Sequence, residues 1–190
     1  LFLERGENGP AASFAALHLE KRDPSSVTAF RIAARAATNA REFATARATL
    51  ENMKRVKGAE AAWAVERAAV ERADKGPAQS LAVLEGAKLD LNDPANEEAL
   101  RAMVEDLLVL QKADAALARV DAALAAHPDA ATLLELRAAT LARAGRTADA
   151  RAAFEKAMAA DPKAARPLIG LATLEAQAGN AAAAVELLDR

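Results

Sequence analysis

The feature that most constrains this chain is a helical pattern that recurs after 34 residues. The segments LLVLQKADAALARVDAALAAHP (residues 107–128) and LARAGRTADARAAFEKAMAADP (residues 141–162) share few letters. Each nevertheless has the outline of a helix end, a turn, a second helix and a proline. Their prolines, Pro128 and Pro162, lie 34 residues apart, and Val120 falls in register with Phe154. A recurrence with a period of about 20 to 50 residues predicts a protein built from repeated supersecondary units.

The composition indicates that each unit is helical. About three residues in ten are alanine, the residue with the highest helix propensity, whereas only 3% of the 190 residues are aromatic. β-Branched and aromatic residues are too sparse for a sheet, so we expect an all-α fold. Because alanine buries little surface, the helices should approach closely and be stabilised by many shallow contacts.

The recurring unit resembles the tetratricopeptide repeat. That resemblance depends on small residues at the eighth, twentieth and twenty-seventh positions, bulk at the twenty-fourth and proline at the thirty-second. In residues 131–164 these positions hold Ala138, Ala150, Ala157, Phe154 and Pro162. The resemblance implies an α-solenoid of stacked antiparallel helix hairpins, wound as a right-handed superhelix.

The repeat frame predicts one array along the whole chain, which we expect to be a fragment of a longer protein. Its units are a partial one at 1–26, full ones at 27–60, 61–96, 97–130 and 131–164, and an incomplete one at 165–190. Residues expected to fill gaps between helices are Phe154, Val120, Leu50, Leu84 and Leu188. Gly145 and Gly179 should allow tight turns, and Thr147 and Asn180 should cap the helices that follow.

The sequence contains no pattern typical of an enzyme. His18 and His127 have no carboxylate partners at metal-ligand spacing, and the chain has no cysteine. The stretch ERGENGPA (residues 4–11) follows no strand and lacks the Lys-Ser/Thr of a phosphate loop. We therefore predict no enzymatic activity, no metal and no cofactor. Trp63 is interpreted as a packing residue, with a ligand-stacking role as the alternative.

The charge distribution bears on the class of partner. The net charge is −2, which favours binding neither to nucleic acid nor to anionic membranes. No apolar run approaches the ~18 residues needed to span a bilayer, so we expect no direct membrane insertion. The charge is uneven along the chain, since residues 1–60 carry +3 and residues 97–130 carry −4.

The resemblance to the family also implies where a partner would bind. It places the first helix of each unit on the concave side, with ligand contacts at the second, fifth, ninth and twelfth positions. The candidate groove residues are Thr28, Arg31, Arg35, Arg72, Glu98, Arg101, Glu105 and Glu135. Such a groove would run from basic to acidic and suit a segment of opposite polarity, although a solvated face with accidental polarity is the alternative. Arg35 stands where the family's clamp for a C-terminal carboxylate needs asparagine, which argues against binding of a chaperone tail.

The leading hypothesis is therefore an interaction scaffold that binds a protein or peptide segment in this groove. The alternative is a structural spacer within a larger complex, with end-to-end self-association. The Ala/Arg/Leu-rich repeats that end in Asp-Pro are also similar to bacterial repeat proteins, including lipoproteins associated with exopolysaccharide export and envelope assembly. That similarity implies the bacterial cytoplasm or periplasm, with the periplasm preferred.

Overall fold

The computed structural model describes residues 8–189, and the described residues form helices and no strands. The α-helices are α1 (Asn8–Lys21), α2 (Val27–Asn39), α3 (Phe43–Met53), α4 (Glu60–Lys75), α5 (Pro77–Gly86), α6 (Glu97–Val109), α7 (Ala113–Ala126), α8 (Ala131–Arg143), α9 (Thr147–Ala160), α10 (Ala165–Gln177) and α11 (Ala181–Leu188). A 3-10 helix, η1 (Pro94–Asn96), precedes α6. The expected all-α fold is confirmed. The chain divides into two compact units, unit 1 (Leu1–Asp90) and unit 2 (Leu91–Arg190).

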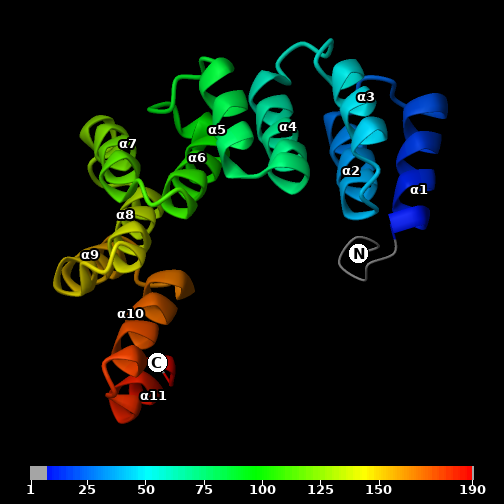
Figure 1. The fold of residues 1–190 in the computed structure, drawn as a ribbon. Coiled ribbons are helices and arrows are strands. Elements are labelled where there is room, and N and C mark those ends of the chain that lie inside the picture. Colours follow the sequence, from blue (N-terminus) through cyan, green and yellow to red (C-terminus); the bar gives the residue numbers. More distant parts are fainter. Residues whose placement is uncertain (1–7, 190) are drawn as a thin grey trace. The chain divides into compact units, whose positions relative to one another are not determined.

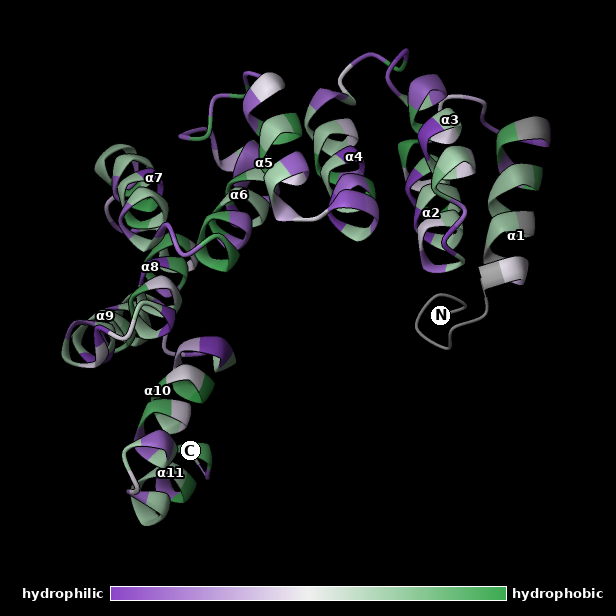
Figure 2. Ribbon diagram, viewed as in Figure 1, coloured by the Kyte–Doolittle hydropathy of each residue, from purple (hydrophilic) through white to green (hydrophobic). Residues whose placement is uncertain are grey.

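Unit 1 consists of α1 followed by two helix hairpins (Figure 1). Helix α2 packs on α1, α3 and α4, and α4 packs on α5. The core between these helices contains Phe30, Leu50, Met53 and Val70, with alanines between them. Because alanine is so frequent, most helices are only moderately hydrophobic (Figure 2). Burial is therefore spread over several helix interfaces and is not concentrated in one centre.

Unit 2 consists of three hairpins, α6–α7, α8–α9 and α10–α11. One of its apolar clusters includes Leu117, Leu141, Phe154 and Leu174. The Phe154 ring lies against the backbone of α10, where a Cβ added to Gly170 would overlap the ring. Glycine at this position is therefore what allows the bulky twenty-fourth residue of one repeat to pack on the next.

Each described hairpin turn contains one residue of positive φ, which stands at the sixteenth position in the α4–α5 turn (Gly76) and otherwise at the fifteenth position of the repeat. Gly145 (φ 75°) and Gly179 (φ 84°) occupy it as predicted. Arg41 (φ 61°) and Gln111 (φ 58°) occupy the same position in two other repeats, although such φ values disfavour residues that carry a side chain. The backbone turn is therefore retained where the sequence carries no glycine to mark it.

Two local predictions, for Thr147 and Leu188, are wrong, and a third, for Asn180, holds only in part. Thr147 is the first residue of α9, and Arg146 holds the capping position. Asn180 does hold the capping position of α11, but its Nδ2 donates to Glu175 Oε2 at 2.8 Å instead of its oxygen accepting from the helix. Leu188 is 57% exposed because no described helix packs beyond α11. The other gap-filling residues, from Leu50 to Phe154, are buried as expected.

None of the helices that the structure describes is long and apolar enough to cross a membrane. Within residues 8–189, no group of three or more His, Asp or Glu side chains could hold a metal ion.

Candidate functional site

The predicted groove residues lie on the first helices of their hairpins. We call the surfaces that these residues form the first-helix faces. Unit 1 carries Thr28, Arg31 and Arg35 on α2 and Arg72 on α4; unit 2 carries Glu98, Arg101 and Glu105 on α6 and Glu135 on α8. Thr28, Arg35 and Glu98 are exposed, and the others are partly buried.

In unit 1 the two predicted arginines of α2 converge on one buried carboxylate of α4. Arg31 Nε donates to Glu66 Oε1 at 2.7 Å, and Arg35 Nε donates to Glu66 Oε2 at 2.9 Å. Glu66 is only 2% exposed, whereas the side chains of Arg31 and Arg35 keep 27% and 48% of their surface in solvent. Glu66 was not predicted from the sequence. The one sequence feature that pointed to it is its position, roughly one repeat beyond the two arginines.

In unit 2 the equivalent link runs from α6 to α8. Arg101 Nε donates to Glu97 Oε1 at 2.9 Å, and Arg101 Nη2 donates to Glu135 Oε2 at 2.8 Å. Burial disfavours the charged form of Arg101, but the hydrogen bonds to Glu135 and Glu97 outweigh that effect and raise its pKa. Glu105 forms an ion pair with Arg143 of α8. Sequence reasoning had assigned Glu105 and Glu135 to the groove but had not identified Arg143.

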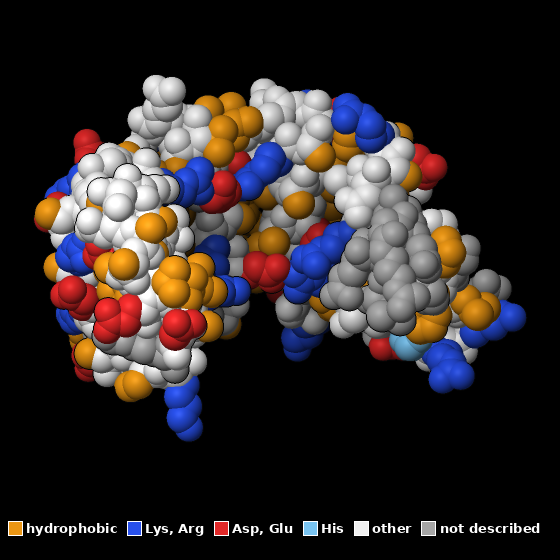
Figure 3. Space-filling view, turned by 90° about the horizontal axis from the view of Figure 1, so that it is seen from below, with side chains coloured by type: hydrophobic (Ala, Val, Ile, Leu, Met, Phe, Trp, Pro, Cys, Tyr) orange, Lys and Arg blue, Asp and Glu red, His pale blue; other side chains and the backbone are white. Residues whose placement is uncertain are grey.

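These contacts form a charge ladder, defined here as the ion pairs between consecutive first helices within each unit. Arg31, Arg35 and Glu66 make up the ladder in unit 1, and Arg101, Glu135, Glu105 and Arg143 make it up in unit 2. Basic and acidic side chains accordingly lie interspersed on the face shown in Figure 3. The arrangement holds charged groups in defined positions while leaving several of them partly exposed.

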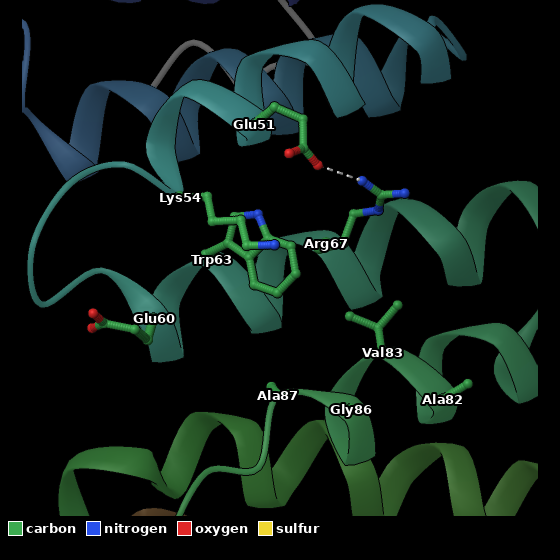
Figure 4. A pocket seen from close by; sticks show the side chains of 9 residues that line it. All are labelled: Glu51, Lys54, Glu60, Trp63, Arg67, Ala82, Val83, Gly86 and Ala87. Carbon is green, nitrogen blue, oxygen red and sulfur yellow. Dashed lines mark hydrogen bonds and ion pairs between the residues drawn. The ribbon is translucent and has the colours of Figure 1, made fainter.

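A second surface lies on the other side of α4, between the second helices of unit 1. We call it the α3–α5 furrow (Figure 4). It encloses about 540 Å³; Trp63 and Arg67 form its floor, Glu51 and Lys54 one rim, and Val83 and Gly86 the opposite wall. The sequence predicted no site here, and Trp63 was interpreted as a packing residue with ligand stacking as the alternative.

Comparisons with known families point to one repeat class. One tetratricopeptide repeat model matches residues 101–165, and a second matches residues 141–190. A search of the curated proteins returned no match.

Solved structures share the fold at low sequence identity. PilW, described as a widely conserved type IV pilus biogenesis factor, aligns with a TM-score of 0.66 and 21% identity over 98% of this chain and 85% of its own. PilF of Pseudomonas aeruginosa aligns with a TM-score of 0.62 and 18% identity over 98% and 83%. YrrB, described as a TPR protein with an unusual peptide-binding site, aligns with a TM-score of 0.51 and 17% identity over 94% and 91%. The repeat models show that residues 101–190 contain tetratricopeptide repeats, and the solved structures show that the chain as a whole shares the helix-hairpin fold of such proteins.

Proposed function

We propose that this chain is a protein–protein interaction scaffold that binds an extended or helical segment of a partner on its first-helix faces. Proteins of this repeat family are generally scaffolds and not enzymes. The observation that carries the proposal is the charge ladder, in which Arg35, Glu105 and Arg143 are held by ion pairs and still keep 44% to 48% of their side-chain surface exposed.

The ladder favours binding for two physical reasons. A side chain that is already held in one geometry loses less rotamer entropy when a partner engages it. Charges of both signs at defined spacing also favour one register of a complementary segment and speed its association. YrrB is described as having a peptide-binding site and PilW as a pilus biogenesis factor, which is consistent with a role in holding protein segments.

A photo-crosslinking experiment tests the proposal directly. A benzophenone amino acid at Thr28, which is exposed on α2, should crosslink to the partner. The same group at Ala118, which is exposed on α7, should crosslink far less. Equal yields from both positions would contradict binding on the first-helix face.

A matched pair of substitutions tests the role of the ladder charge. Arg35→Gln should reduce crosslinking from Thr28, because it removes one exposed cation while Arg31 still neutralises Glu66. Reversing both arginines is not a clean test, since Glu66 would remain buried without either of them. Arg55→Gln removes the same charge from the exposed connection between α3 and α4 and should leave crosslinking unchanged. A loss of the same size in both variants would mean that only net charge matters.

Self-association is a second candidate function. Ile169 on α10 and Val185 and Leu188 on α11 are 53%, 58% and 57% exposed, and a second copy could cover such apolar side chains. Light scattering across a dilution series distinguishes the two candidates, because a scaffold that acts alone stays monomeric at all concentrations.

A further inference from the structure

We propose that the α3–α5 furrow of unit 1 is a second docking site, which takes one bulky apolar side chain of a partner peptide whose neighbouring carboxylate pairs with Lys54. The furrow is lined by residues of α3, α4 and α5 and by Lys54. It contains none of the predicted groove residues, so the inference does not rest on the proposed function.

The furrow is a feature of the repeat and not an isolated gap. In unit 1, Arg67 at the seventh position of its repeat pairs with Glu51, at the twenty-fifth position of the preceding repeat, at 3.3 Å. In unit 2, Arg137 and Asp121 hold the same two positions and pair at 2.7 Å. Both pairs line a cavity between consecutive second helices, of about 540 Å³ in unit 1 and about 270 Å³ in unit 2.

The unit 1 furrow is larger because its far wall is short and carries small side chains. Helix α5 has 10 residues and ends at Gly86, whereas α9 has 14 residues. At the twenty-sixth position of the repeat, Gly86 stands in the unit 1 furrow where Lys156 lines the unit 2 furrow. A Cβ added at Gly86 would meet no atom within 4 Å, which shows that the wall has unfilled space beside it.

The floor of the furrow is suited to an apolar group. Trp63 is half-buried, and the Lys54 ammonium lies 4.7 Å from the centre of its ring. This contact places a cation over the indole face without closing the furrow, since Lys54 itself is exposed. An apolar side chain that enters between Trp63 and Val83 would leave water and contact both residues, and the burial of its apolar surface would favour binding. The volume falls within the roughly 300 to 1,000 Å³ of typical binding pockets.

The charges on the rim favour an acidic neighbour for that side chain. Arg67 already pairs with Glu51 and with Glu71, so these charges compensate one another. Lys54 forms no ion pair with any described residue; its contact is the Trp63 ring. Glu60 points away from Trp63 (Figure 4). A carboxylate at the rim would therefore meet an uncompensated ammonium, which could swing from the ring to the carboxylate and uncover the indole.

Trp63 provides the readout, because it is the only tryptophan in the chain and yields a single indole N–H resonance. The full chain is titrated with two blocked peptides, acetyl-Gly-Leu-Glu-Gly-amide and acetyl-Gly-Leu-Lys-Gly-amide. The glutamate peptide should shift the indole resonance in a saturable way. The lysine peptide should bind roughly two- to five-fold more weakly, the range expected from one exposed ion pair.

Four variants make the outcome decisive. Val83→Phe and Gly86→Leu each fill the furrow and should abolish the shift, whereas Ala118→Phe adds similar apolar surface at an exposed position of α7 and should preserve it. Lys54→Gln should remove the preference for the glutamate peptide. Circular dichroism melts confirm that the fold is retained.

Four results would overturn the proposal: no shift with either peptide, equal binding of the two, shifts that persist in both filled variants, or an indole resonance that moves with protein concentration alone. The last result would mean that a second copy of the chain occupies the furrow.

Discussion

Glu71 in unit 1 and Leu141 in unit 2 occupy the same repeat position, the eleventh, and both are buried. Glu71 accepts hydrogen bonds from Arg47, whose Nε and Nη2 lie 2.8 and 2.9 Å from its two carboxylate oxygens. Leu141 shares an apolar cluster with Leu117, which stands at the position of Arg47 in its own repeat. The same junction between consecutive repeats is therefore ionic in unit 1 and apolar in unit 2.

Unit 2 also contains an ionic junction of the same kind. Arg151 of α9 donates to Glu175 of α10 at the same two repeat positions. The junction thus requires two side chains that fill the space between consecutive repeats and that leave no buried charge unpaired. An ion pair or an apolar pair can meet this requirement. The physical reason is that desolvation offsets most of the Coulomb gain of a buried ion pair, so an apolar pair of similar volume can replace it.

The largest expected effect comes from placing half of the ionic junction in the apolar one. Leu141→Glu would bury a carboxylate beside Leu117 without the counterpart of Arg47, and the arginine one turn earlier, Arg137, already pairs with Asp121. The substitution should lower the free energy of unfolding by about 3 to 5 kcal/mol. Adding Leu117→Arg should recover much of that loss by recreating the pair of unit 1. Urea unfolding measures both variants, and a double variant no more stable than the single one would show that the two junctions are not interchangeable.

A smaller effect should distinguish the two ionic junctions. In Arg47→Leu, Glu71 keeps Arg67 Nε at 2.8 Å and Lys75 Nζ at 3.1 Å. In Arg151→Leu, Glu175 keeps only the Asn180 amide among the partners that the described residues provide. The urea midpoint should therefore fall further in Arg151→Leu than in Arg47→Leu. The opposite order would indicate that Arg67 and Lys75 do not compensate for the loss of Arg47 as a partner of Glu71.

The smallest expected effect is a difference in acid sensitivity. The hydrogen bond from Arg47, reinforced by Lys75 and Arg67, lowers the pKa of Glu71 from 4.5 to about 2. Because the pKa in the folded state lies below its unfolded value, the stabilisation is complete above pH 4.5 and is lost as the pH falls towards 2. Hydrogen exchange at about pH 6 and about pH 3 should show greater loss of protection in α3 and α4 than in α7 and α8. Glu71→Gln should reduce that loss, and an unchanged loss in this variant would assign the acid sensitivity to other carboxylates.

Sequence reasoning succeeded where a property depends on residues close together in the chain. The alanine content predicted helices, and Pro128 and Pro162 predicted where α7 and α9 stop. It failed at Arg41 and Gln111, which adopt the left-handed turn without glycine, because the surrounding hairpin imposes that φ and the residue type does not reveal it.

The candidate site was predicted less completely than the helices, because its contacts join residues that are far apart in the chain. The repeat frame assigned Arg31, Arg35 and Glu105 to first helices, and the structure places them there. The frame could not show that Glu66 neutralises the two arginines, or that Arg143 pairs with Glu105, because these contacts join residues 31 to 38 positions apart.

By itself, then, the sequence determined that this protein is helical, that its hairpins recur about every 34 residues, and that α7 and α9 stop before Pro128 and Pro162. These properties follow from local propensity and spacing, which act within one or two turns of the chain. Only the tertiary structure decided which charges are compensated and where a cavity remains. Both outcomes depend on the side chains that three different helices bring together, as Glu51, Trp63 and Val83 show in the α3–α5 furrow.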